Sequence, residues 1–271
     1  MRIKTFAFIF TLFFSFWASA ANKVDYKKIF GERDGCFLIL DKRTGVIVDE
    51  YNSTRCDIRF SPYSSFKIAA ALMAFETGVF KDEKQIIRWD GVKRGRKEID
   101  QDLTPITFMS ASAKWVTEWI MPKVGEKKIA AFLKSFSYGN QDFSGGLKDA
   151  WVSSSLKISA REQVSFLSKF WSGELGLSSI TNEKAKNVFF VKKLGDNTEL
   201  YGKTGTGCLE GNKCLSQPDK MIGWFVGILK NDKDIFVFAG NASDLKPHGP
   251  PAGPRMREAT EAILKQMGLV N

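Results

Sequence analysis

Histidine is almost absent from this chain of 271 residues, in which His248 is the only one. A Ser-His-Asp site would therefore have a single possible base, and a zinc site a single imidazole ligand. The four cysteines include no C-x-x-C pair, and no internal repeat or low-complexity segment is present. After the first twenty residues, no apolar run is long enough to span a bilayer. The scarcities argue against histidine-based and metal-based chemistry, and we expect no metal site.

The first twenty residues have the composition of a secretory signal. Residues 1–4 are short and basic, residues 6–17 are apolar, and Ala18-Ser19-Ala20 has the small-x-small pattern of a cleavage site. An uncleaved anchor is the alternative. We expect residues 1–20 to be a signal peptide, and the mature chain to be exported without a membrane contact.

The remaining residues, 21–271, are numerous enough for one domain with a substantial core. The formal net charge is +10, and its densest basic run is residues 93–97, Lys-Arg-Gly-Arg-Lys. Basic chains often meet nucleic acid, but export argues against such a partner. We interpret this run as a solvated loop in preference to a binding patch.

Four cysteines in an exported chain suggest disulfides. Cys208 and Cys214 flank a short segment that a bridge could close into a loop. Cys36 and Cys56 lie at the outer ends of a predicted hairpin. Among the three possible connectivities, we favour 36–56 with 208–214.

Sequence patterns change from strands to helices and back to strands. Residues 36–41 and 46–51 read as a hairpin after a short amphipathic stretch at 24–30. Residues 66–75 are almost all apolar, which is typical of a buried helix. Further helices are expected in three segments, 112–120, 126–136 and 158–171, the last with a capping box of Ser159 and Glu162.

Strand patterns return at residues 199–205, 221–229 and 235–239, and a last helix is expected over 254–267. This order predicts an α/β fold of the α+β type, with one antiparallel sheet built from both ends of the chain. The sheet part would comprise about 21–60 and 196–271. A helical part, about 61–195, would be inserted between them.

Ser64-Ser65-Phe66-Lys67 places a hydroxyl and an amine three residues apart at the start of the apolar run. On a helix such residues share a face, and a serine can be activated there without histidine. Burial would lower the pKa of the lysine and make it a base. The alternatives are a helix-capping serine and a lysine that extends to solvent.

Three other motifs are less specific when taken singly. Lys203-Thr204-Gly205 suits a substrate carboxylate beside a closely approached strand, but any polar strand with a glycine bulge would look similar. Tyr138-Gly139-Asn140 reads as a turn, and Trp151 reads as a core residue. A second S-x-x-K, residues 154–157, lies in a polar stretch and is expected to be an ordinary loop and cap.

Taken together, the motifs resemble the penicillin-recognising serine enzymes, and most closely the class D serine β-lactamases, or oxacillinases. The resemblance rests on their order along the chain: Ser64-Ser-Phe-Lys67, Ser112-Ala-Lys114, Tyr138-Gly-Asn140, Trp151 and Lys203-Thr-Gly205. The Ser-Asp-Asn motif of class A enzymes is not found. The resemblance implies a β-lactamase/transpeptidase-like fold, a bacterial periplasmic location and hydrolysis of penicillin-type β-lactams, by a monomer or a homodimer.

The resemblance also implies a set of catalytic roles. Ser64 would form the acyl-enzyme, and Lys67, carboxylated by carbon dioxide, would be the general base. Trp151 would donate its indole N–H to that carbamate, and Ser112 would relay a proton to the leaving nitrogen. No other cofactor is implied.

Substrate binding is implied for a further group of residues. The backbone N–H groups of Ser64 and Thr206 would form the oxyanion hole. The substrate carboxylate would bind Lys203, Thr204 and Gly205, together with an arginine near the last helix, for which we favour Arg255 over Arg257.

Two features leave alternatives open. Lys114 stands where the family usually has valine, so it would either point away from the carbamate or pair with it. A penicillin-sensor domain of a receptor and a D-Ala-D-Ala peptidase share much of the same nucleophile chemistry.

Overall fold

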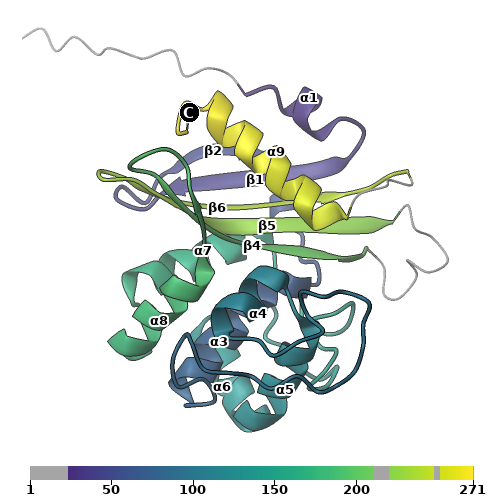
Figure 1. The fold of residues 1–271 in the computed structure, drawn as a ribbon. Helices are drawn as coiled ribbons and strands as arrows, with labels where there is room; N and C mark the ends of the chain where they lie inside the picture. Colours follow the sequence, from purple (N-terminus) through teal and green to yellow (C-terminus); the bar gives the residue numbers. More distant parts are fainter. Residues whose placement is uncertain (1–23, 210–219, 247–250, 271) are drawn as a thin grey trace, which may run out of the picture.

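The computed structural model describes residues 24–209, 220–246 and 251–270. The predicted signal peptide, Cys214 and His248 lie outside these ranges. The fold class expected from the sequence is confirmed: a single six-stranded antiparallel sheet with helices on both faces (Figure 1). No helix in the described ranges is long and apolar enough to cross a membrane.

The sheet is built from both ends of the chain. Its strand order is β2-β1-β6-β5-β4-β3. The bounds are β1 Asp34–Asp41, β2 Ile47–Tyr51, β3 Phe190–Lys193, β4 Glu199–Cys208, β5 Met221–Lys230 and β6 Ile235–Ser243. The central strands β5 and β6 are buried along nearly their whole length, because side chains on both faces are covered.

One face of the sheet is covered by α1 (Tyr26–Phe30) and α9 (Ala252–Gln266) (Figure 1). The apolar core under α9 includes Phe37, Phe225, Phe238, Met256 and Ile263. The other face packs on the helical part. Its elements are α2 Ser53–Cys56, η1 Tyr63–Phe66, α3 Lys67–Glu76, α4 Pro105–Ala111, α5 Lys114–Val124, α6 Glu126–Ser135, α7 Ala160–Ser172 and α8 Ser179–Phe189.

The buried helix predicted from the apolar run is α3, in which every residue from Lys67 to Phe75 is buried. The capping box of α7 is also confirmed, because Ser159 and Glu162 each bond to the other's backbone N–H. Helices α4 and α8 were not predicted from the sequence. The capping box of α4 uses Thr107 where glutamate or glutamine is usual, and α8 is mostly polar, with only a few buried apolar residues.

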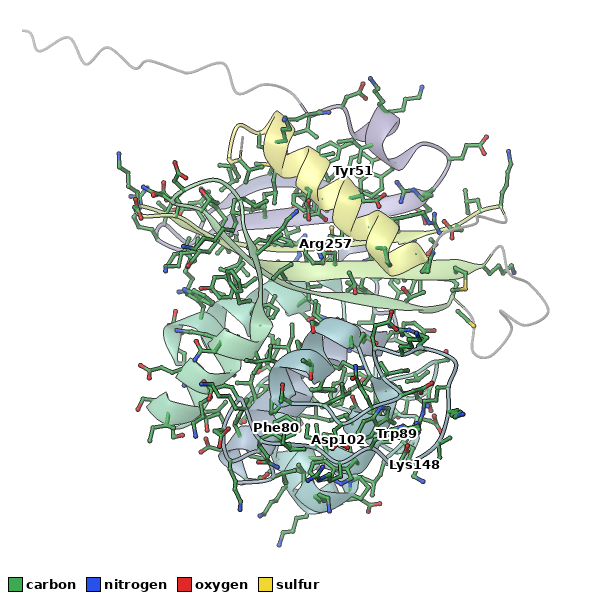
Figure 2. The ribbon with its side chains drawn as sticks, viewed as in Figure 1. Tyr51, Phe80, Trp89, Asp102, Lys148 and Arg257 are labelled. Atoms are coloured by element: carbon green, nitrogen blue, oxygen red, sulfur yellow. The ribbon has the colours of Figure 1, made fainter. Side chains whose placement is uncertain are left out.

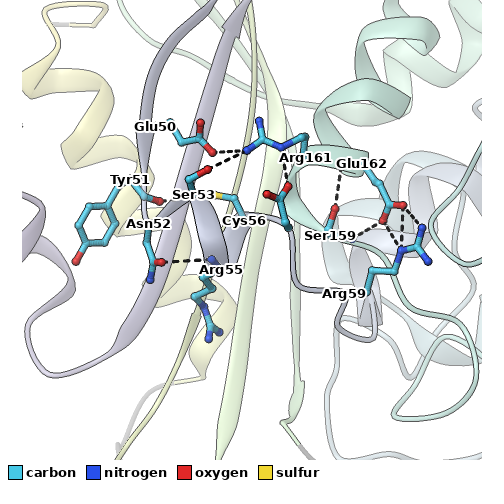
Figure 3. Close-up of polar contacts among 11 residues, drawn as sticks. Glu50, Tyr51, Asn52, Ser53, Arg55, Cys56, Arg59, Ser159, Arg161 and Glu162 are labelled. Atoms are coloured by element: carbon cyan, nitrogen blue, oxygen red, sulfur yellow. Dashed lines mark hydrogen bonds and ion pairs between the residues drawn. The ribbon is translucent and has the colours of Figure 1, made fainter.

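Ion pairs fasten the sheet to the helical part (Figure 3). Arg161 of α7 bonds Glu50 of β2 at 2.5 Å and Asp57 at 2.7 Å. Arg59, in the segment that leads to η1, pairs with Glu162 of the same helix. These contacts fix the path of residues 52–62 and therefore the position of η1.

The expected disulfide between Cys36 and Cys56 is not formed, and both are buried free thiols. Each sulfur has a polar partner of its own: Asn241 Nδ2 donates to Cys36 Sγ (3.4 Å), and Cys56 Sγ donates to the carbonyl of Tyr51 (3.6 Å). A hydrogen bond with Cys36, together with burial, raises the pKa of Cys56, which keeps that thiol protonated. Cys208 is disulfide-bonded, whereas its expected partner, Cys214, lies outside the described residues.

Leu72→Ala should destabilise the protein by about 2–5 kcal/mol, because Leu72 is fully buried in α3 and truncation leaves a cavity. Chemical denaturation gives the free energy of unfolding. Leu245→Ala is the matched control, since Leu245 is 62% exposed and its loss should cost less than about 0.5 kcal/mol. Equal losses for the two variants would contradict this account of the core.

Candidate active site

Ser64 and Lys67 meet at the junction of η1 and α3. Lys67 Nζ lies 3.1 Å from Ser64 Oγ. Ser64 makes no capping hydrogen bond at the start of either helix, and only 1% of Lys67 is exposed. Ser64 is therefore not a helix-capping serine, and Lys67 does not extend to solvent.

The surroundings of Lys67 favour a neutral amine. Burial holds the pKa of Lys67 well below its usual value, and the nearby cations Lys203 and Lys114 lower it further. Glu118 acts in the opposite direction but does not outweigh them. The amine lies 5.9 Å from the centroid of the Phe108 ring. Such an amine can accept a proton from Ser64 at neutral pH.

Trp151 packs behind the nucleophile. Its ring stacks on Phe66 with centroids 5.4 Å apart, and its carbonyl accepts a hydrogen bond from Tyr63 N at 3.0 Å. Trp151 is 1% exposed. Its indole N–H is a hydrogen-bond donor and can serve a group bound beside it.

The Tyr138-Gly139-Asn140 motif is a structural turn, as its plain reading suggested. Tyr138 packs edge-on against Phe66 (5.9 Å between centroids), and Asn140 bonds the backbone at Ser155 and Lys157. A Cβ on Gly139 would lie 2.0 Å from the carbonyl of Lys157. The motif therefore supports the aromatic packing behind Ser64 and Lys67.

A cavity of about 590 Å³ opens in front of Ser64, where β4 meets the helical part. It is lined by Ser64, Arg96, Ser110, Ala111, Ser112, Thr204, Thr206, Pro251 and Pro254. Ser112 ends α4 in the left-handed region, at φ 57°, and Tyr63 adopts φ 50°. Non-glycine residues rarely take this conformation, and such backbone strain is typical of functional sites.

Strand β4 forms the opposite wall. Its pairing with β3 ends at Tyr201, so beyond that residue β4 is the edge of the described sheet. Gly205 is required here, because a Cβ would lie 2.8 Å from the carbonyl of Pro62 in front of η1. The hydroxyl of Thr206 accepts a hydrogen bond from Gly253 N at 2.8 Å. This brings the start of α9 to the cavity.

Lys203 is 4% exposed and lines a smaller neighbouring cavity of about 180 Å³, together with Ser110, Thr204 and Arg257. Its Nζ donates to the carbonyl of Thr204 at 3.3 Å. Burial, with added repulsion from Arg257 and Arg96, lowers the pKa of Lys203 to about 7. Lys203 is therefore a cation whose charge depends on pH in the neutral range.

The structure places Arg255, which the sequence predicts at the substrate carboxylate, outside this cavity. Arg255 does not line the cavity around Ser64; its guanidinium pairs with the buried carboxylate of Asp244, with Nη1 2.7 Å from Oδ1. It faces a separate cavity bordered by α1. Two residues along α9, about half a helical turn, reverse the direction of the side chain, so Arg257 is the one that lies beside Lys203.

Lys114 does not pair with the amine of Lys67. Its Nζ lies 2.8 Å from Glu118 Oε1 and 3.1 Å from Asp149 Oδ1. Burial alone would lower the pKa of Lys114, but hydrogen bonds with these two carboxylates raise it. Lys114 therefore stays charged while its charge is largely neutralised by its neighbours.

Sequence reasoning missed Arg96 in the cavity wall. Residues 93–97 form a largely exposed loop, as the sequence predicts, and Arg96 within it also lines the cavity with Ser64. The available signal was the glycine within the basic run followed by Asp100, an arrangement typical of a tight turn around a carboxylate.

Comparison with known proteins identifies the family. The penicillin binding protein transpeptidase domain matches residues 35–264. The chain is 37% identical to β-lactamase OXA-1 of Escherichia coli over 236 residues, which are 82% of this chain and 83% of that protein.

Solved structures agree with this comparison. A class D β-lactamase from Bacillus subtilis superposes with a TM-score of 0.81 at 33% identity, covering 93% of this chain and 98% of that one. The C-terminal domain of the Bacillus licheniformis BlaR penicillin receptor gives a TM-score of 0.82 at 30% identity, over 92% and 96%. The chain belongs to the penicillin-binding protein transpeptidase family and, within it, to the class D serine β-lactamases.

Proposed function

We propose that the chain hydrolyses penicillin-type β-lactams through an acyl-enzyme on Ser64, with Lys67 as the residue that carries the general base. The observation that carries this proposal is the buried amine of Lys67, 3.1 Å from Ser64 Oγ. No carboxylate of the described residues bonds to this amine, so the amine can be neutral. Export to the periplasm through residues 1–20 belongs to the same proposal.

The proposed reaction has two steps. Ser64 Oγ attacks the lactam carbonyl, its proton passes to the base at Lys67, and Ser112 relays that proton to the leaving nitrogen as the C–N bond breaks. Water then attacks the ester, and the base at Lys67 takes the proton of the water and returns it to Ser64 Oγ as the acid is released. Backbone N–H groups of Ser64 and Thr206 would stabilise the oxyanion in both steps, and Lys203 with Thr204 would hold the substrate carboxylate.

A carboxyl group on Lys67 Nζ fits the residues around it. Carbon dioxide adds only to a neutral amine, and burial favours that form of Lys67. The indole N–H of Trp151, which packs on Phe66 behind the nucleophile, would donate to the added oxygen. When present, the carbamate would supply the general base beside Ser64.

The likeness to the BlaR receptor domain makes a sensor the second candidate. A sensor and a hydrolase would form the same ester on Ser64 and differ in how long it lasts. The lifetime of that ester therefore decides between them.

Ser64→Ala should abolish hydrolysis of nitrocefin, because no other group supplies the covalent oxygen. Ser154→Ala, in the second S-x-x-K, is the matched control and should retain activity. Intact-protein mass spectrometry should find a penicillin adduct on the wild-type chain that decays within seconds. A stable adduct would instead favour the sensor, and turnover by Ser64→Ala would refute the nucleophile.

Trp151→Phe should lower activity by about tenfold or more at ambient bicarbonate, because a hydrogen bond to a charged group is worth about 1.5–3 kcal/mol. Added bicarbonate should restore part of the loss. NMR with ¹³C-bicarbonate should show a carbamate carbon in the wild type and a weaker one in the variant. A fully active wild-type enzyme without a ¹³C-labelled carbamate would contradict carboxylation and leave the amine of Lys67 as the base.

For penicillins, kcat/KM should fall as pH rises through about 7, because Lys203 loses its charge above its pKa of about 7. The decrease should appear mainly as a rise in KM, because the charge of Lys203 would bind the substrate carboxylate. The pH profile of kcat/KM reports the ionisation of the free enzyme. Arg257→Met should move this limb to higher pH, because repulsion from Arg257 lowers the pKa of Lys203. A profile that the substitution leaves in place would contradict the assignment of the limb to Lys203.

A further inference from the structure

Arg96 is held at the cavity by a folded loop. Three successive backbone N–H groups, of Arg94, Gly95 and Arg96, donate to the carboxylate of Asp100 at 2.9–3.2 Å. The N–H groups of Ile99 and Asp100 in turn bond the carbonyl of Arg96, at 3.0 and 2.9 Å. Backbone N–H groups converging on an anion form a rigid nest, so the loop is a defined structure.

The segment between α3 and α4 that contains this loop is fastened at its base. Trp89 and Asp102 lie in this segment (Figure 2), and Asp102 accepts a hydrogen bond from Trp89 N at 2.8 Å. Ile87 and Leu103 bond each other's backbone at 2.7 and 3.0 Å. These contacts hold the ends of the loop together. Backbone hydrogen bonds in the turn around Asp100 and at the base of the segment therefore set the position of Arg96.

The guanidinium of Arg96 is only lightly engaged. Nη2 donates to the carbonyl of Ala111 at 3.1 Å, which turns the group towards the wall that carries Ser112. Its one ion pair in the described chain is with Glu98, 3.9 Å away, and the two side chains are 54% and 67% exposed. A guanidinium has five N–H donors, so most of them remain available to a ligand.

None of the described residues that line the cavity around Ser64 is acidic, yet Arg96 lies in its wall and Lys203 lies in the adjoining wall. In the proposed function, Lys203 and Thr204 take the carboxylate that penicillins share. Arg96 would then be a second anion-binding group, left over when a substrate with one carboxylate is bound.

We propose that Arg96 binds a second carboxylate carried on the acyl side chain of the substrate, so that this enzyme favours dianionic β-lactams. The inference rests on the proposed role of Lys203 and Thr204. Bidentate pairing of a guanidinium with a carboxylate supplies both the affinity and the direction. Because Arg96 is on the rim, its contribution is reduced by salt.

The test compares benzylpenicillin with carbenicillin, which is the same penicillin with one more carboxylate on its side chain. The carbenicillin-to-benzylpenicillin ratio of kcat/KM should fall about fivefold to tenfold in Arg96→Met, as expected for a half-exposed charged contact. Arg96→Lys should restore part of the ratio. In the wild type the ratio should decline as ionic strength rises.

Lys97→Met is the matched control, because it removes the same charge from the adjacent exposed residue and should leave the ratio unchanged. An equal loss for both penicillins would overturn the proposal, since Arg96 would then hold the wall or the shared carboxylate. An unchanged ratio in Arg96→Met would overturn it as well. If the wild type hydrolysed neither penicillin, the proposed function itself would fail.

Discussion

The site depends on the burial of one amine. A charged ammonium in an apolar interior without a paired anion is too costly to persist, so Lys67 is stable there mainly as a neutral group. The apolar helix α3 and the rings of Phe66, Phe108 and Trp151 form that environment. The same packing places the amine within reach of Ser64 Oγ. Reactivity and core packing are therefore one property of this fold.

A second constraint is the close approach of the sheet edge to η1. Gly205 leaves room for the carbonyl of Pro62, and a Cβ on Gly207 would lie 1.8 Å from the ring of Tyr63. Tyr63 takes a left-handed backbone conformation there and bonds Ser153 at 2.7 Å. These contacts join the two halves of the chain at the nucleophile. Larger residues at either glycine would push β4 away from Ser64.

The sequence allowed the local parts of this arrangement to be predicted. Ser64 and Lys67 are one helical turn apart, and Lys203 follows a strand pattern, so the periodicity alone placed their side chains. The choice between Arg255 and Arg257 could not be made from the sequence, because the rotation of a helix with a proline-rich start decides which arginine lies beside Lys203. Arg96 was missed because a nest around Asp100 depends on backbone geometry that a run of basic letters does not reveal. The predicted 36–56 disulfide rested on the spacing of the hairpin. It is not formed, and the two sulfurs bond Asn241 Nδ2 and the carbonyl of Tyr51 instead.

The charges around the cavity explain why Arg96 differs from its neighbours. Lys114 is neutralised by Glu118 and Asp149, and Arg257 Nε donates to Glu261 at 2.8 Å. Each of these cations still repels a buried lysine, which helps to keep Lys67 or Lys203 from holding a proton. Arg96 alone among them lines the cavity of Ser64, and its acid is the most distant of these partners. A cation that the fold leaves uncompensated at the substrate cavity is best compensated by the substrate, which is why the second carboxylate is expected there.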